Sequence, residues 1–217
     1  MEKTAKILVI DDHPIVRFGL KELLSQHTNM EVWQEASGID EANQVLEKGL
    51  PDLIILDLSL KKGSALDFIK SIRKRYGALP ILVLSMYNEV YYAERAIRVG
   101  ANGYIMKEVI TAHLIEAIQT VLDGEIYLSE TMKAKLLKSM SGKPAKKEGE
   151  EIELLTDREL EVFQLIGQGL TTREIADKLF LSVKTIETYK ENIKRKLNLR
   201  SSSELQQHAA HWYFRSV

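Results

Sequence analysis

Four short apolar runs in this chain end in residues whose side chains could carry out phosphoryl chemistry. These residues are three carboxylates, one hydroxyl and one amine: Asp11, Asp12, Asp57, Ser85 and Lys107. Neighbouring carboxylates repel each other, and Mg²⁺ resolves the repulsion because it prefers oxygen ligands. The cation would neutralise charge as a phosphoryl group moves onto Asp57, with the lysine as a counter-charge and the hydroxyl as a hydrogen-bond partner. The set therefore predicts a magnesium-assisted phosphoryl site.

The apolar runs predict the strands that must bring these residues together. Strands are expected at 6–10, 31–35, 52–56, 80–84 and 102–105. Helical periodicity separates them, over 14–26, 39–48, 64–76, 88–99 and 111–122. Such alternation, with strands apolar on both faces, is typical of an α/β fold with a doubly wound, five-stranded parallel sheet. In the common strand order 2-1-3-4-5 the first and third strands are neighbours, which would place Asp11 and Asp12 beside Asp57.

The length and composition indicate two domains and exclude some kinds of chemistry. A chain of 217 residues suits a first domain at 1–123 and a second at 154–217. The linker between them, 124–153, is expected to hold a helix at 129–140 and is poorest in apolar residues over 141–153. The absence of cysteine excludes disulfides and thiolate chemistry. No membrane-length apolar run or signal peptide is visible, so we expect a cytoplasmic protein with no membrane partner.

The second domain reads as helices only. Four are expected, at 157–167, 172–179, 183–197 and 202–213. Three capping boxes of the form Ser/Thr-x-x-Glu mark helix starts, and they pair Thr156 with Glu159, Thr171 with Glu174 and Ser201 with Glu204. Ser182 is expected to cap the third helix. Gly167 and Gly169 are expected to separate the first helix from the second.

The second and third of these helices form a helix-turn-helix pattern. A tight turn at 180–182 joins them, Ala176 would allow a close crossing, and four apolar residues are expected to form the buried seam: Ile175, Leu179, Val183 and Ile186. Residues 184–200 carry six basic and two acidic side chains, although the whole chain is balanced at 30 basic and 31 acidic. A basic helix in a neutral domain suits phosphate contact. On spacing alone, an ordinary bundle with a solvated lysine face stays an alternative.

The acids and their partners give the first domain a close resemblance to the receiver domain of bacterial response regulators, over residues 5–123. The resemblance implies that a cognate histidine kinase phosphorylates Asp57 and that Ser85 and Lys107 read the phosphoryl group. It implies Mg²⁺, with Mn²⁺ as the alternative. Asp12 and Asp57 would be direct ligands of this cation, Asp11 would act through water, and the Ser59 backbone carbonyl would be the third protein ligand.

The same resemblance assigns a switch role to Tyr104, which would turn inward when Ser85 is drawn to the phosphoryl group; the alternative is a half-buried tyrosine without a dynamic role. Two positions depart from the family pattern. Lys61 stands where the family usually has proline, which leaves the loop shape open. Glu108 follows Lys107 where many receivers have proline, which makes a cis peptide costly.

An enzyme of the haloacid dehalogenase type also uses a phosphorylated aspartate and Mg²⁺. Such a phosphatase needs a second aspartate two positions after the acceptor as general acid, and here that position is Ser59, which cannot do this near neutral pH. We therefore expect a phosphoacceptor switch, limited at most to its own phosphorylation and dephosphorylation. The other alternative is a DNA-binding protein whose receiver works unphosphorylated as an interaction module.

The helical domain closely resembles the LuxR-type DNA-binding domain over about 154–215, from Leu155-Thr156 through Leu181-Ser182-Val183 to Lys196-Leu197. Paired with a receiver, this is the NarL/FixJ-type response regulator arrangement. The resemblance implies that 183–197 is a recognition helix in the major groove of double-stranded DNA. Its base-edge candidates are Glu187, Thr188 and Glu191. Its phosphate candidates are Lys184, Thr185, Lys190 and Lys194.

This arrangement predicts that phosphorylation controls homodimerisation and sequence-specific DNA binding, and so regulates transcription, with RNA polymerase as a further partner. A dimer would span two half-sites about one helical turn apart. His208 and His211 are expected on a packing or dimer face with Leu205, Ala209 and Trp212 rather than in a metal site. His13 is expected to be a loop residue rather than a ligand.

Overall fold

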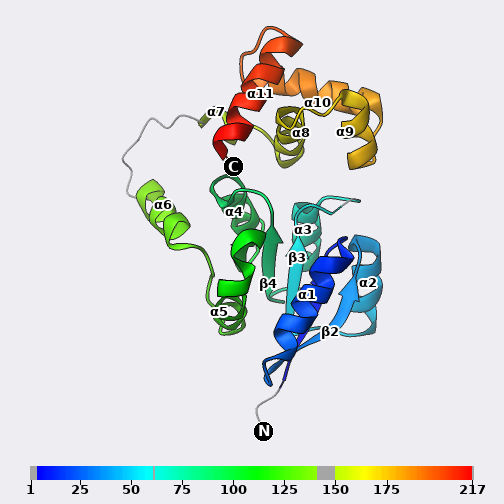
Figure 1. Cartoon of the computed structure of the whole chain (residues 1–217), viewed down its shortest axis with the longest axis vertical. Helices are drawn as coiled ribbons and strands as arrows, with labels where there is room; N and C mark the ends of the chain where they lie inside the picture. Colours follow the sequence, from blue (N-terminus) through cyan, green and yellow to red (C-terminus); the bar gives the residue numbers. More distant parts are fainter. Residues whose placement is uncertain (1–3, 61, 141–149, 217) are drawn as a thin grey trace. The chain divides into compact units, whose positions relative to one another are not determined.

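The computed structural model describes residues 4–60, 62–140 and 150–216. The chain divides into two compact units, Met1–Gly142 and Lys143–Val217, and each is described by itself (Figure 1). The predictions made for Lys61 and for the linker residues 141–149 concern residues outside this description. None of the helices within the described ranges combines the length and the apolarity needed to cross a membrane.

The first unit is built on five parallel strands in the order β2-β1-β3-β4-β5, which confirms the predicted doubly wound α/β sheet. The strands are β1 (Ala5–Ile10), β2 (Met30–Ala36), β3 (Leu53–Asp57), β4 (Ile81–Ser85) and β5 (Gly103–Met106). Every residue of β3 and β4 is buried, as expected for strands covered on both faces. The pairing of Ile10 with Leu56 sets the carboxyl ends of β1 and β3 side by side.

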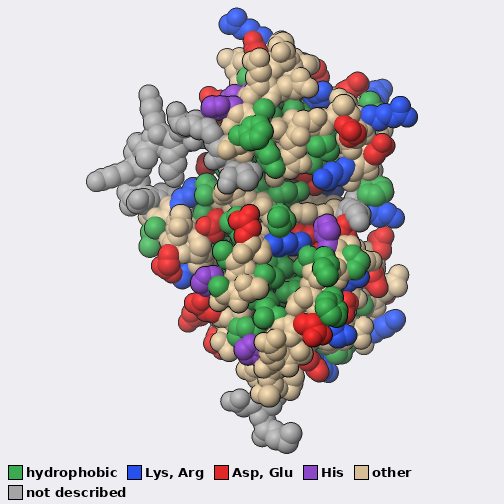
Figure 2. Space-filling model, in the orientation of Figure 1, with side chains coloured by type: hydrophobic (Ala, Val, Ile, Leu, Met, Phe, Trp, Pro, Cys, Tyr) green, Lys and Arg blue, Asp and Glu red, His purple; other side chains and the backbone are tan. Residues whose placement is uncertain are grey.

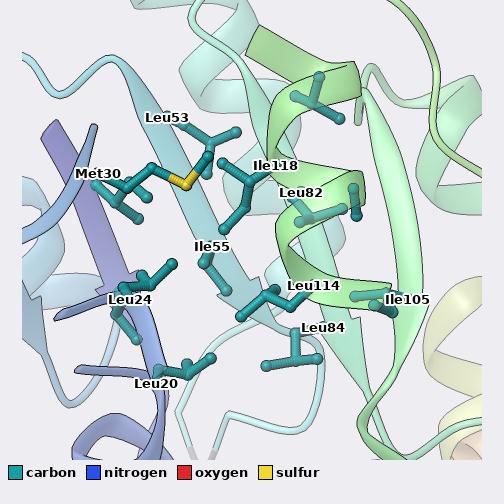
Figure 3. Packing of buried hydrophobic residues seen from close by; sticks show 14 residues of the cluster. Leu20, Leu24, Met30, Leu53, Ile55, Leu82, Leu84, Ile105, Leu114 and Ile118 are labelled. Atoms are coloured by element: carbon teal, nitrogen blue, oxygen red, sulfur yellow. The ribbon is translucent and has the colours of Figure 1, made fainter. Parts of the chain in front are cut away.

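Helices connect the strands and cover the sheet. They are α1 (Pro14–Ser25), α2 (Ile39–Lys48), α3 (Ala65–Tyr76), α4 (Glu89–Arg98) and α5 (Ile110–Leu122), and the 3-10 turn η1 (Lys107–Val109) precedes α5. On one face, Leu20 and Leu24 of α1 and Leu114 and Ile118 of α5 pack with Ile55 of β3 in one apolar cluster (Figure 3). This cluster fixes the strands beneath the acidic loops.

The chain after α5 continues along the edge of the sheet. Tyr127 forms a parallel bridge with Gly103, and the Tyr104 backbone N–H donates to the Tyr127 carbonyl oxygen at 3.0 Å. Helix α6 (Glu130–Met140) follows, as predicted for 129–140. The Lys135 ammonium donates to the Val90 carbonyl oxygen in the first turn of α4 at 2.7 Å. The segment that leads out of the first unit is therefore bonded both to β5 and to α4.

The second unit contains α7 (Glu150–Glu153), α8 (Asp157–Gly167), α9 (Thr172–Leu179), α10 (Val183–Lys196) and α11 (Ser202–Ser216). The predicted capping boxes at Thr156 and Thr171 are both present. Ser182 caps α10 by accepting from the Thr185 backbone N–H. Helix α7 lies in the range that the sequence assigned to the linker, and its Ile152 is buried. Packed structure therefore begins before residue 154.

Two local predictions for α10 and α11 differ from the structure. Val183 is 44% exposed and lies outside the buried seam, because the inward face of α10 is formed by Ile186 and Ile193. The Ser201 hydroxyl accepts from the Glu204 backbone N–H at 3.1 Å as predicted, but the Glu204 carboxylate accepts from the Arg200 backbone N–H at 2.6 Å and does not close the capping box.

Gly167 lies at the predicted boundary between the first and the second helix of the module. It is the last residue of α8, and the left-handed residue that ends the turn is Gly169, with φ at 85°. A Cβ at position 167 would lie 2.5 Å from the Ala209 carbonyl oxygen on α11. Glycine is present there because two helices approach closely.

We predict that Gly167→Ala lowers the free energy of unfolding of the second unit by about 1–3 kcal/mol, because the added methyl overpacks the contact with α11. Urea unfolding of the full chain, followed by Trp212 fluorescence in a Trp33→Phe background, measures this change. Gln168→Ala, at the exposed neighbouring position, is the matched control and should change the value by less than about 0.5 kcal/mol. Equal stability of the two variants would contradict the close-packing role.

Candidate functional site

The structure brings the predicted acids together at the carboxyl ends of β1 and β3. Asp11 and Asp57 are each 1% exposed. Ligand atoms of Asp11, Asp12, His13 and Asp57 all lie within 4.8 Å of one another, the one such group found among the described residues. Three clustered carboxylates fit Mg²⁺, which takes oxygen ligands and keeps several waters. The donor set therefore suits the cation that the sequence implies.

Lys107 ties two of these acids together. Its ammonium donates to Asp11 Oδ2 at 2.6 Å and to Asp57 Oδ2 at 2.9 Å. The sequence predicted a positive charge at this site, but it did not predict the contact with Asp11, which is 96 positions away in the chain. Burial opposes the charged form of the lysine, yet the attraction of Asp57 and the bond to Asp11 outweigh it and raise the pKa of Lys107.

Asp57 is placed for reaction by its own strand and by the next loop. It ends β3, and its Oδ1 accepts from the Ser59 backbone N–H at 3.0 Å. Burial raises the pKa of Asp57 above its ordinary value; the charge of Asp11 adds to this, while Lys107 opposes it. The Asp57 carboxyl is therefore ionised less readily than an exposed aspartate. A cation bound at the site would stabilise its ionised form.

Ser85 and Tyr104 lie in one hydrogen-bonded group beside Asp57. Ser85 is fully buried at the end of β4, and its hydroxyl accepts from the Tyr87 backbone N–H at 3.0 Å. The Tyr104 hydroxyl donates to the Tyr87 carbonyl oxygen at 2.6 Å. Tyr104 is 1% exposed, so it is buried rather than half-buried, while its switch role stays a prediction. Burial raises the pKa of Tyr104 despite its hydrogen bond with the Ser85 side chain.

His13 lies in a loop, as predicted, and the structure places its side chain beside the acids. Its Nδ1 lies 3.1 Å from Asp11 Oδ1 and 2.9 Å from Asp12 Oδ1. The Asp11 carboxylate accepts from the His13 backbone N–H at 2.8 Å, an Asx-turn that folds residue 13 back over the acids. The signal available in the sequence was the aspartate two positions before the histidine, a spacing that permits this turn.

The candidate DNA contacts of α10 divide into exposed and engaged side chains. The exposed ones are Lys184 and the three base-edge candidates, Glu187, Thr188 and Glu191. Two of the phosphate candidates are held within the module: Lys190 donates to the Thr172 hydroxyl at 3.0 Å, and Thr185 is paired with Ser182 at 2.8 Å. Lys194, whose side chain is 16% exposed, pairs at 2.8 Å with the exposed Glu191 of the same helix. The helix therefore presents a mixed face of acids, hydroxyls and lysines.

Of the two histidines of α11, His208 takes part in packing, whereas His211 is exposed. The His208 ring lies 5.9 Å from the Phe163 ring of α8, and Trp212 lies 5.4 Å from the same ring. Leu205 and Ala209 are fully buried on this face.

Figure 2 shows acidic, basic and hydrophobic side chains interspersed over the surface that it displays.

Comparisons with known proteins match both units. Residues 7–119 match the family described as response regulator receiver domain, and residues 153–209 match the bacterial regulatory proteins of the luxR family. The chain is 38% identical over 208 residues to the oxygen regulatory protein NreC of Staphylococcus carnosus, covering 94% of this chain and 96% of that protein. NreC of Staphylococcus aureus strain MRSA252 is 36% identical with the same coverage.

Solved structures give the same result. The chain is similar to RcsB from Salmonella enterica serovar Typhimurium bound to promoter rprA in the presence of phosphomimetic BeF3⁻, with a TM-score of 0.67 and 27% identity over 96% of this chain and 99% of that one. RcsB bound to promoter P1flhDC gives a TM-score of 0.68 and 27% identity over 96% and 100%.

We predict that Asp57→Asn stabilises the metal-free chain at neutral pH. Because burial raises the pKa of Asp57, the folded state loses stability as pH rises from the ordinary carboxyl range, about pH 4, through the raised value. The advantage of the variant should therefore be present near pH 8 and vanish near pH 4.

Chemical unfolding across this pH range in a chelator measures the difference. Asp123→Asn, at an exposed aspartate, is the control and should show no such trend. If Asp57→Asn were less stable than wild type near pH 8, the unfavourable burial of this charge would be contradicted.

Proposed function

The chain belongs to the NarL/FixJ-type response regulators, and from this membership we propose that a cognate histidine kinase phosphorylates it on Asp57. The observation that carries the assignment is the position of this carboxylate, which is buried at the end of β3 and bridged to Asp11 by the Lys107 ammonium. The phosphorus–nitrogen bond of the phosphohistidine breaks as the Asp57 oxygen bonds to phosphorus. The product is an acyl phosphate, which makes this residue mainly an acceptor of a signal rather than a turnover catalyst.

Asp11, Asp12, Asp57 and the Ser59 backbone carbonyl would hold Mg²⁺, which neutralises developing charge when bound. The chain's own residues perform the remaining work. The Lys107 ammonium, 2.9 Å from Asp57 Oδ2, can pair with a phosphoryl oxygen at that atom. The buried Ser85 hydroxyl is the second group that can bond the phosphoryl oxygens, since it belongs to the next strand of the sheet.

The hydrogen bonds around Tyr104 offer a route by which the state of Asp57 reaches the linker. Tyr104 is bonded through its hydroxyl to the loop that follows Ser85 and through its backbone N–H to Tyr127. The hydroxyl of Ser129, two residues further along, donates to the Glu89 carboxylate in the first turn of α4. A shift of Ser85 toward a phosphoryl group would therefore move atoms bonded to the segment that leads into α6.

We predict that radiolabelled acetyl phosphate with Mg²⁺ labels the wild-type chain and fails to label Asp57→Asn, because the amide cannot accept the phosphoryl group. Gel autoradiography measures the labelling. Asp123→Asn, at an exposed aspartate, is the matched control and should label like wild type. Persistent labelling of the Asp57 variant would refute the assignment of the acceptor.

For the helical unit we propose sequence-specific binding to double-stranded DNA through α10, as a homodimer on two half-sites, to regulate transcription with RNA polymerase as a further partner. The luxR-family match over residues 153–209 supports this, together with the exposed polar face of α10. Solved RcsB neighbours include two dimers bound to two parallel DNAs. Glu187, Thr188 and Glu191 are the base-edge candidates, and glutamate can accept from cytosine N4.

Lys184, whose side chain is exposed, is the phosphate contact that we propose with the most direct support. Lys190 donates a hydrogen bond to Thr172, so it joins α9 to α10 in addition to its proposed contact with DNA. Lys194 is also proposed as a phosphate contact, although its side chain is only 16% exposed and pairs with Glu191 at 2.8 Å. Its ammonium would have to leave this carboxylate to reach a phosphate.

We predict that Lys194→Ala weakens binding to all DNA sequences alike and lowers the slope of log K against log salt by about one, because one phosphate contact is lost. Glu187→Gln is the contrasting variant, and its effect should be confined to particular base pairs. Binding titrations against a randomised site library at several salt concentrations measure both. A sequence-selective loss in the lysine variant would contradict its assignment to phosphate.

A further inference from the structure

His13 occupies a helix-capping position without acting as a cap. It is the N-cap residue of α1, yet its side chain makes no capping hydrogen bond. Serine, threonine, aspartate or asparagine would normally fill this position and satisfy an N–H of the first turn. Here the imidazole faces the acidic cluster instead, and Pro14 removes one of the N–H groups that a cap would serve. The His13 side chain therefore contacts the acids and does not cap α1.

The spacing between His13 and the acids fits a shared cation. Ligand atoms about 2.1 Å from an octahedral metal are about 3 Å apart at adjacent corners and about 4 Å apart at opposite corners. His13 Nδ1 lies 2.9 Å from Asp12 Oδ1 and 3.1 Å from Asp11 Oδ1. It lies 4.0 Å from Asp57 Oδ2. All three acids thus lie at distances from His13 Nδ1 that suit ligands at neighbouring or opposite corners.

The imidazole and the lysine approach the acids through different atoms. Lys107 bonds to the Oδ2 atoms of Asp11 and Asp57. The short contacts of His13 are made with the Oδ1 atoms of Asp11 and Asp12. The two groups therefore meet different oxygen atoms of Asp11, while Asp57 Oδ2, which lies 4.0 Å from His13 Nδ1, also accepts from Lys107. The His13 side chain is 52% exposed, so the ring has room to turn and solvent can supply the remaining ligands.

We propose that His13 is a nitrogen ligand of the cation at this site, which makes the site prefer Mn²⁺ and other first-row transition ions over Mg²⁺. Imidazole suits these ions, whereas Mg²⁺ favours oxygen ligands and gains little from nitrogen. The inference rests on the proposed function, because it assigns a ligand and a metal preference to the same phosphorylation site. Mn²⁺ would then be the better-held cation whenever both metals are present at equal concentration.

Electron paramagnetic resonance of Mn²⁺ added to the full-length chain tests the proposal without using activity. We expect electron spin echo modulation from a directly bound nitrogen in the wild type, which changes to the ¹⁵N pattern when the histidines are labelled with ¹⁵N. His13→Ala should abolish this modulation. His113→Ala, at an exposed histidine on α5, is the matched control and should retain it.

Affinities supply the second readout. We expect His13→Ala to weaken Mn²⁺ binding by about tenfold or more, and competition should show Mg²⁺ affinity changed by less than about twofold. The second variant, His13→Asn, restores a common helix cap and should show the same loss, which separates metal binding from folding of α1.

The outcomes separate this inference from the proposed function. If Mn²⁺ binds in an Asp57-dependent way without nitrogen modulation, His13 is only a hydrogen-bond donor to the acids, and the inference fails while the phosphorylation site stands. Equal losses of Mn²⁺ and Mg²⁺ affinity in His13→Ala would also overturn it. If Asp57→Asn leaves Mn²⁺ affinity unchanged, the cation does not bind at the acceptor and the proposed function fails with the inference.

Discussion

The ammonium of Lys107 holds together two buried carboxylates that would otherwise repel each other. Asp11 and Asp57 can be adjacent because β1 and β3 are neighbours in the sheet, and Lys107 reaches them from the turn that follows β5. This balance of charge requires the whole strand order, since the three residues come from three strands. It also leaves the acids short of positive charge, which is why the site suits a hard cation and a phosphoryl group.

A change at Asp57 is transmitted because the neighbouring polar groups are buried and bonded to one another. Ser85, Tyr87 and Tyr104 form a connected group, and Tyr104 is also bonded to Tyr127 at the edge of the sheet. Buried polar groups must keep partners, so displacing one of them obliges the others to find new ones. The segment that leads to α6 is thereby linked to the chemistry at the carboxyl ends of the strands.

The sequence predicted what depends on local pattern, and it missed what depends on packing between distant segments. Strand ends and helix caps were found because apolar runs and capping boxes are local signals. The inward turn of His13 was missed, although an aspartate two positions earlier permits it. The close contact at Gly167 was missed because its partner lies on α11. Val183 was misassigned because the rotation of α10 about its axis depends on the helices packed against it. The residue types predicted where the site lies, but its hydrogen bonds follow only from the folded structure.

Phosphorylation of Asp57 is proposed to control DNA binding. The most direct measurement uses DNA fragments that the wild-type chain enriches from genomic DNA. It compares the affinities of the wild type and of Asp57→Asn for these fragments, with and without a phosphodonor. We expect acetyl phosphate and Mg²⁺ to tighten binding by the wild type by about tenfold or more, which is about 1.4 kcal/mol of coupling. Asp57→Asn should bind with the same weak affinity with and without the phosphodonor. Equal affinities of the wild type with and without the donor would contradict the account and favour a receiver that works unphosphorylated.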